Sequence, residues 1–260
     1  MILAGKKIEL IVLVALVVFI YINILWARRG KIIPKIRAMP ALQAMREVIG
    51  RAAEEKRAVH ISTGLGGLAD EWAPMTIAAM SIFRKVARYC GEFGVRVKYF
   101  CILGHMLPPM QDLIKGGYAL AGRPELYSDD MVEYVGEGQQ RALMAAMMGY
   151  ITREKPAVNV LLGAGFYETY ISLGCGAVAG SLQIAGTPRL YYQGILIALA
   201  DYTLIGQELY AAAASITENP PDLGGIKGQD WGIYLAVLIM IITAILATAK
   251  LTVWADLLRW

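Results

Sequence analysis

The sequence predicts an α/β protein: an open, mostly parallel Rossmann-like sheet with helices on both faces, plus two transmembrane helices. Two long apolar runs lie near the ends of the 260 residues, and short apolar runs alternate with helical patterns between them. Several of the short runs end in glycine-rich turns. With 57% hydrophobic and 18% charged residues and a mean hydropathy of +0.50, the chain is too apolar for a soluble domain and too polar for a bundle wholly in lipid.

The first apolar run, residues 8–27, is long enough to cross a membrane. Glu9 and Asn23 interrupt an otherwise apolar stretch. About 20 helical residues span the ~30 Å hydrocarbon layer, and Tyr21 and Trp26 suit the membrane interface. The alternative is a cleaved signal peptide, but the run exceeds a typical signal-peptide core and no A-x-A-like site follows it.

Basic residues after this run predict its orientation. Lys6 and Lys7 precede it, whereas a segment with five basic residues and no acid follows it: Arg28, Arg29, Lys31, Lys35 and Arg37. Since Lys and Arg are enriched in cytoplasmic loops, we expect the domain between the spans to be cytoplasmic and both termini to lie outside. The net charge of +4 then reports membrane topology and not a nucleic-acid surface.

The second apolar run, residues 231–254, would return the chain across the membrane. Trp231, Tyr234 and Trp254 give it aromatic ends, and Lys250 is close enough to one end to reach the head groups. Neither run has an acid or a base near its middle, so neither predicts an ion pathway. The expected layout is an outside N-terminus (1–7), a first span (8–27), a basic linker (28–40), a cytoplasmic α/β domain (41–217), a linker (218–230), a second span (231–254) and an outside tail (255–260).

The segment between the spans alternates strand and helix patterns. Short apolar runs predict strands at 58–62, 95–103, 131–135, 157–163 and 182–186. Helical periodicity predicts helices at 41–57, 74–93, 109–120, 139–152, 167–179 and 191–216, the last in one piece or in two that meet near Gly206. Strands separated by helices of this length are typical of βαβ units in a parallel sheet covered on both faces.

Three of the expected strands end in glycine turns that lead into helices. In open α/β sheets such turns gather at the carboxyl edge, where ligands bind, and helix N-termini there favour anions. The candidate ligand-binding residues are Thr63, Gly64, Gly66, Gly67, Gly163, Gly165, Glu168, Gly186 and Thr187. The alternative is that the glycines only make tight turns and close helix-to-sheet contacts, and that Glu168 caps its helix.

Motifs that would identify a cofactor or a reaction are missing from the sequence. The glycines at 64, 66 and 67 do not form G-x-G-x-x-G, and neither a P-loop nor a G-x-S-x-G nucleophile elbow occurs. The two histidines and three cysteines have no metal-ligand or disulfide spacing. The sequence therefore favours a protein without enzymatic activity and predicts no cofactor, no metal site and no nucleic-acid partner.

Four polar residues in the expected elements have assignable roles. His60 falls within a strand and is expected in the core, whereas His105 follows a strand and could reach the carboxyl edge. Asp201 and Glu208, seven residues apart in the last expected helix, would share one face. A solvated or interfacial stripe is the favoured role for these acids, with pairing to Arg189 or a neighbouring subunit as the alternative.

Four segments resemble a family of prokaryotic membrane proteins described only as a domain of unknown function. They are VHISTGLGGLAD (59–70), NVLLGAGFYETY (159–170), QIAGTP (183–188) and DYTLIGQELYAAAA (201–214). The resemblance covers about residues 40–230 and implies an α/β region between an N-terminal and a C-terminal span. That family has no established activity, so the resemblance implies no catalytic residues. Gln207 departs from the family pattern, in which an acid is expected.

Two functions fit these features. The first is a membrane-anchored scaffold or assembly subunit, whose cytoplasmic α/β domain mediates homo-oligomerisation or partner binding within a membrane protein complex. Apolar helical runs outside the spans, at 143–148 and 211–214, favour it, and membrane lipid would be a further partner. The alternative is a membrane-tethered ligand-binding or sensory domain that recognises a nucleotide or another anion at the glycine turns.

Overall fold

The computed structural model describes residues 7–30 and 35–249, and the chain divides into two compact units. One unit combines Met1–Ile36 with Thr217–Trp260, and the other is Arg37–Ile216. Except for Lys7, the expected outside segments 1–7 and 255–260 lie outside the described residues, as does the end of the expected second span.

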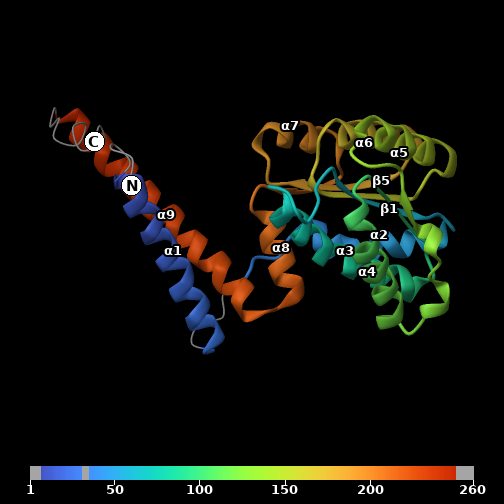
Figure 1. The fold of residues 1–260 in the computed structure, drawn as a ribbon, viewed down its shortest axis with the longest axis horizontal. Helices are drawn as coiled ribbons and strands as arrows, with labels where there is room; N and C mark the ends of the chain where they lie inside the picture. Colours follow the sequence, from blue (N-terminus) through green and yellow to red (C-terminus); the bar gives the residue numbers. More distant parts are fainter. Residues whose placement is uncertain (1–6, 31–34, 250–260) are drawn as a thin grey trace. The chain divides into compact units, whose positions relative to one another are not determined.

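The first unit is an antiparallel pair of helices, α1 (Lys7–Arg28) and α9 (Pro220–Thr248) (Figure 1). Both helices are long and apolar enough to cross a membrane. The face of α9 that contacts α1 carries glycines four residues apart, at Gly224, Gly228 and Gly232. A Cβ on Gly228 would lie 2.6 Å from Ile20 Cα. The two helices therefore approach backbone to backbone, as small-residue rows allow in membranes.

The second helix of this pair starts earlier than the apolar run suggests. Asn219 is its N-cap and Pro220 its first residue, an arrangement typical of helix starts. Most of the segment expected as a linker, 218–230, is therefore helical. Two of its three glycines, Gly224 and Gly228, lie against α1, so much of the glycine content that suggests a linker in the sequence allows close helix packing.

The second unit is a six-stranded parallel sheet with helices on both faces, which confirms the predicted fold class (Figure 1). Its strands are β1 (Val59–Gly64), β2 (Val97–Cys101), β3 (Val132–Tyr134), β4 (Val158–Ala164), β5 (Leu182–Thr187) and β6 (Tyr202–Ile205). Their order is β3-β2-β1-β4-β5-β6, and every neighbouring pair is parallel. This is the Rossmann strand order, which reverses between β1 and β4.

Helices cover the sheet in two layers (Figure 1). One layer holds α2 (Pro40–Glu54), α3 (Ala73–Phe93), α4 (Leu107–Leu120) and α8 (Glu208–Thr217). The other holds α5 (Gln140–Glu154), α6 (Tyr167–Ala179) and α7 (Leu190–Leu199). Short 3₁₀ turns lie at Gly104–Met106, Pro124–Leu126 and Asp129–Met131.

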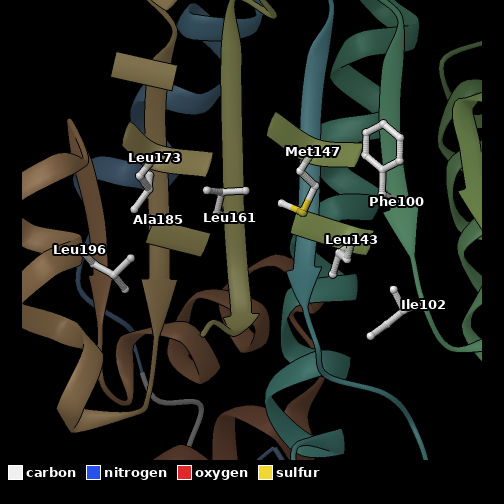
Figure 2. Packing of buried hydrophobic residues seen from close by; sticks show 8 residues of the cluster. All are labelled: Phe100, Ile102, Leu143, Met147, Leu161, Leu173, Ala185 and Leu196. Carbon is white, nitrogen blue, oxygen red and sulfur yellow. The ribbon is translucent and has the colours of Figure 1, made fainter. Parts of the chain in front are cut away.

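A buried apolar cluster joins the sheet to the layer of α5, α6 and α7 (Figure 2). Its members come from three strands or their ends and from all three helices: Phe100, Ile102, Leu143, Met147, Leu161, Leu173, Ala185 and Leu196. Because helices cover both faces, the inner strands are buried on both sides. On β4 every residue is buried, and Asn159 alone interrupts its apolar run.

The segment expected as one or two helices at 191–216 contains strand β6, and that part of the prediction was wrong. β6 pairs in parallel with β5, with Tyr202 opposite Ile184. It has four residues between two apolar helices, so the helical period of its neighbours conceals it. Gly206, with φ +60°, makes the turn into α8, which is where the sequence suggested a break.

Asp201 and Glu208 consequently do not share a helix face. Asp201 precedes β6, and its Oδ2 accepts a hydrogen bond from the backbone N–H of Gln183 at 2.7 Å. Glu208 begins α8 and forms an ion pair with Arg37. The first acid therefore fixes the edge of the sheet, and the second ties the start of α8 to the segment before α2.

Candidate functional site

The nine candidate residues all lie in or just after the ends of β1, β4 and β5, at the carboxyl edge of the sheet. The strand order reverses between β1 and β4, so the turns after these two strands meet. The backbone N–H of Leu65 donates to Ala164 O at 3.3 Å. The β5 turn, with Gly186 and Thr187, lies next to that of β4. In open α/β sheets this reversal is where ligands bind.

The β1 turn is packed tightly against its neighbours. Thr63 Oγ1 lies 2.8 Å from the hydroxyl oxygen of Tyr99. Gly64 has φ +66°, and a Cβ there would overlap Ala164 O. A Cβ on Gly66 would overlap Oγ1 of the buried Thr76. Contacts within the protein therefore account for these glycines.

Asp70 and His105 hold the next part of the same turn. Asp70 accepts hydrogen bonds from the backbone N–H groups of Gly67 (2.7 Å) and Trp72 (2.9 Å). His105 does reach the carboxyl edge, where its Nε2 accepts from the N–H of Leu68 at 3.2 Å. Both side chains therefore act as acceptors for turn backbone at the start of α3.

The β4 and β5 turns are closed in the same way. A Cβ built on Gly163 would lie 3.2 Å from Thr63 O. A Cβ on Gly165 would lie 2.9 Å from Thr169 Oγ1, and a Cβ on Gly186 would lie 2.8 Å from Leu204 Cβ. Thr187 Oγ1 accepts from the N–H of Arg189 at 3.3 Å. The cavity among these turns measures about 10 Å³, roughly the space of one water molecule. A ligand role for the glycines stays a prediction.

Glu168 lies buried at the start of α6, with both carboxylate oxygens engaged. Oε1 accepts from the backbone N–H of Phe166 at 3.0 Å, and Oε2 accepts from Gln140 Nε2 at 2.9 Å. Burial raises the pKa of this carboxyl, and the hydrogen bonds and the charge of Arg189 oppose that shift. Glu168 therefore links α6 to α5 and caps the turn.

Arg189 is the residue at this edge that sequence reasoning did not propose as a ligand-binding residue. Its guanidinium carbon lies 3.9 Å from the ring centroid of Phe166, 4.7 Å from that of Tyr192 and 5.9 Å from that of Trp72. Its Nη1 is buried without a hydrogen-bond partner, and no other charged side chain in the described part of the chain has such an atom. The sequence signal, an arginine between a strand end and a helix, is too common to have identified it.

A much larger cavity, about 680 Å³, lies at the opposite, amino edge of the sheet. Basic side chains line it, including Arg57, Arg96, Lys98 and Arg153. Three of these are engaged: Arg57 donates to the carbonyl oxygens of Lys155, Pro156 and Ala179, Arg96 pairs with Asp130, and Lys98 pairs with Glu133. The C-terminal ends of α2, α3 and α5 border this cavity, and basic residues are stabilising at such ends. Ion pairs and backbone hydrogen bonds within the chain therefore engage three of these four basic side chains.

Comparison with known proteins identifies a family of unknown function. The chain matches the family described as "Domain of unknown function (DUF6754)" over residues 2–258. This confirms the resemblance to a domain of unknown function; the prokaryotic and membrane character of that family stays a prediction. Neither a curated protein nor a solved structure matches the chain.

Proposed function

The chain belongs to the DUF6754 family, whose description gives no activity. We propose that the protein is a membrane-anchored scaffold whose α/β domain self-associates through α7. In this proposal α1 and α9 anchor the domain in the cell membrane. The five basic residues that begin at Arg28 favour a cytoplasmic domain, with the segments before α1 and after α9 outside.

The outer face of α7 is the observation that carries the proposal. Seven of its ten residues are exposed, and none is charged: Leu190, Tyr191, Gly194, Ile195, Ile197, Ala198 and Leu199. At 100° per residue these positions cover about 200° of the helix circumference without interruption. Tyr191 is 91% exposed and Leu190 is 79% exposed. Continuous apolar surfaces of this kind are typical of interaction sites.

Gly194 lies near the middle of this outer face, and no packing contact in the described part of the chain requires a glycine there. A Cβ built on it meets no atom within 4 Å, and its backbone is not left-handed. Glycine inside a helix costs about 1 kcal/mol relative to alanine, and no contact among the described residues offsets that cost. Together with Ala198, four residues later, it forms a small-residue row that lets a second helix approach closely.

A second copy of the chain is the partner that fits this surface best. Residues 190–200 include no charged side chain, so the surface offers no complementarity to an acidic or basic protein. A two-fold contact places the same surface on both sides, where an uncharged face has no like-charge repulsion. The exposed side chains supply on the order of 600 Å² per copy, close to the ~800 Å² per partner of a stable interface. Helices that lie on lipid usually carry Lys or Arg on the polar face, which α7 lacks.

The mass of the detergent-solubilised, full-length protein tests this proposal. Native mass spectrometry should give a dimer or a larger closed assembly for the unmodified protein and a monomer for Gly194→Leu. The matched control is Gly116→Leu on α4, where a built Cβ also meets no atom within 4 Å; this variant should keep the assembly.

Three outcomes would overturn the proposal. A monomeric unmodified protein, both in detergent and after cross-linking in native membranes, would contradict self-association. An unchanged mass for Gly194→Leu would assign the assembly to another surface, such as the outer sides of α1 and α9. Quenching of Tyr191→Trp fluorescence by brominated lipid would show that lipid covers α7.

A further inference from the structure

Three helix N-termini converge on Arg189 at the carboxyl edge of the sheet. The N-cap residues of α3, α6 and α7 are Trp72, Phe166 and Arg189, and none caps its helix with a side-chain hydrogen bond. Ser, Thr, Asp and Asn are preferred at this position. The rings of Trp72 and Phe166 lie 5.0 Å apart, and the Arg189 guanidinium lies against both. Each N-terminus carries roughly half a positive charge, so positive charge accumulates around this guanidinium.

The acids nearby leave the charge of Arg189 unpaired. Asp70 uses its oxygens on backbone N–H groups of the β1 turn, and Glu168 uses its oxygens on Phe166 N–H and Gln140. Among the ion pairs of the described residues, none involves Arg189. Burial raises the pKa of the Glu168 carboxyl, and the charge of Arg189 opposes that shift. A buried N–H donor without an acceptor costs free energy.

Two buried donors at this place lack acceptors. Arg189 Nη1 and the hydroxyl of Tyr170 are both buried without a hydrogen-bond partner. The Tyr170 ring lies 5.3 Å from the ring of Tyr192, against which the guanidinium packs. Burial raises the pKa of Tyr170 to about 12, so its hydroxyl stays protonated and can donate. An oxyanion between the two groups would satisfy both.

We propose that Arg189, Tyr170 and backbone N–H groups at the starts of α6 and α7 bind the phosphate group of a small phosphorylated ligand. Guanidinium groups match phosphate oxygens in bidentate geometry, and uncapped helix N-termini favour phosphate. The cavity beside Tyr170 and Tyr192 is only about 10 Å³. The ring of Tyr192 must therefore turn outward to admit the ligand, which gives the apolar part of the ligand an aromatic surface. The site adjoins the N-terminal end of the outer face of α7, which carries the proposed self-association.

Thermal unfolding of the full-length protein in detergent tests the site. The probes are inorganic phosphate, AMP, adenosine and a short-chain phosphatidic acid. AMP should raise the melting temperature, whereas adenosine, which lacks the phosphate, should not. Stabilisation by phosphatidic acid without AMP would identify a lipid head group as the source of the phosphate. Stabilisation by inorganic phosphate alone would reduce the site to a free-anion site.

Two substitutions separate binding from a structural role. Arg189→Gln should weaken phosphate binding at least about tenfold. Tyr170→Phe should also weaken phosphate binding, although the phenylalanine ring still contacts the ring of Tyr192. Arg153→Gln, at the opposite edge of the sheet, is the matched control and should bind as the unmodified protein does. If Arg189→Gln does not fold, the phosphate binding of Tyr170→Phe still tests the proposed site.

Two results would overturn the assignment. One is the absence of any shift with the three phosphate-bearing probes at about 10 mM. The other is an equal shift in Arg189→Gln and the unmodified protein. The mass of the same samples reports the assembly state separately, so a failure of the site can be told apart from a failure of self-association.

Discussion

Lowering the pH from 7 to 5 should destabilise the α/β domain through His60. This side chain is fully buried in β1, between register partners Asn159 on β4 and Lys98 on β2. The rings of Phe100 and Tyr150 lie 5.9 Å and 5.8 Å from it. Burial lowers its pKa from 6.5 to about 4; Asn159 opposes this shift and Lys98 adds to it. Neither ring nitrogen has a partner in good hydrogen-bond geometry, so the effect of burial prevails.

The sign and size of the effect follow from these pKa values. Below pH 6.5 the imidazole takes up a proton in the unfolded chain, but in the folded chain it does so only near pH 4. The contribution of His60 to stability is therefore complete above pH 6.5 and is lost as the pH falls towards 4. Between pH 7 and pH 5 the free energy of unfolding should fall by about 2 kcal/mol. For a domain of this size that corresponds to roughly 4–8 °C in melting temperature.

Thermal unfolding of three proteins at pH 7 and pH 5 checks this prediction. His60→Leu removes the buried base and should lose about 4–8 °C less than the unmodified protein between the two pH values. His105→Gln removes the other histidine of the chain and should keep the dependence of the unmodified protein. The carboxyl of Glu168, whose pKa is raised, acts in the opposite direction but is common to all three. Equal losses in His60→Leu and the unmodified protein would refute the reasoning.

Two further predictions concern glycines that the packing requires. Gly66→Ala should lower the free energy of unfolding by about 1–3 kcal/mol, because its Cβ would overlap Oγ1 of the buried Thr76. Gly116→Ala, with open space at its Cβ, should be neutral or slightly stabilising in the same thermal assay, and equal effects would contradict the packing argument. Gly228→Leu should separate α9 from α1, because its Cβ would lie 2.6 Å from the α1 backbone. Disulfide cross-linking between cysteines on facing turns should fall, whereas Gly225→Leu, which faces open space, should preserve it; loss in both variants would contradict a specific contact.

Much of the secondary structure was predictable because its signals are local. Helix α6 was predicted with its observed bounds, Tyr167–Ala179, since Gly165 precedes it and Gly180, with φ +70°, ends it. Strand β4 was recognisable as a largely apolar run, interrupted only by Asn159, because both its faces are buried. Strand β6 was missed because four residues between apolar helices show too little of a two-residue period to be separated from them.

The arrangement in space was less accessible from the sequence. The glycine turns were predicted to gather at the carboxyl edge, and they do so. The pairing of Arg189 with Trp72 and Phe166 depends on which strands are neighbours, and these residues are far apart along the chain. The exposure of α7 could not be predicted either. An apolar helix with no charged residue has the same sequence pattern whether the protein core or a second chain covers it. By contrast, Leu143 and Met147, from the apolar run on α5, are buried in the core of this chain.

Self-association through α7 is tested most directly by disulfide cross-linking in native membranes. Cys90 and Cys101 are buried and Cys175 is half-buried, so a Cys175→Ser background suits single-cysteine variants. Near a two-fold axis a cysteine at the centre of the interface meets its own copy, since a disulfide needs Cβ atoms about 4 Å apart. Ala198→Cys should therefore form a linked dimer on mild oxidation. Val178→Cys on α6, 91% exposed, should not; equal linking at both positions, or none at Ala198, would contradict the account.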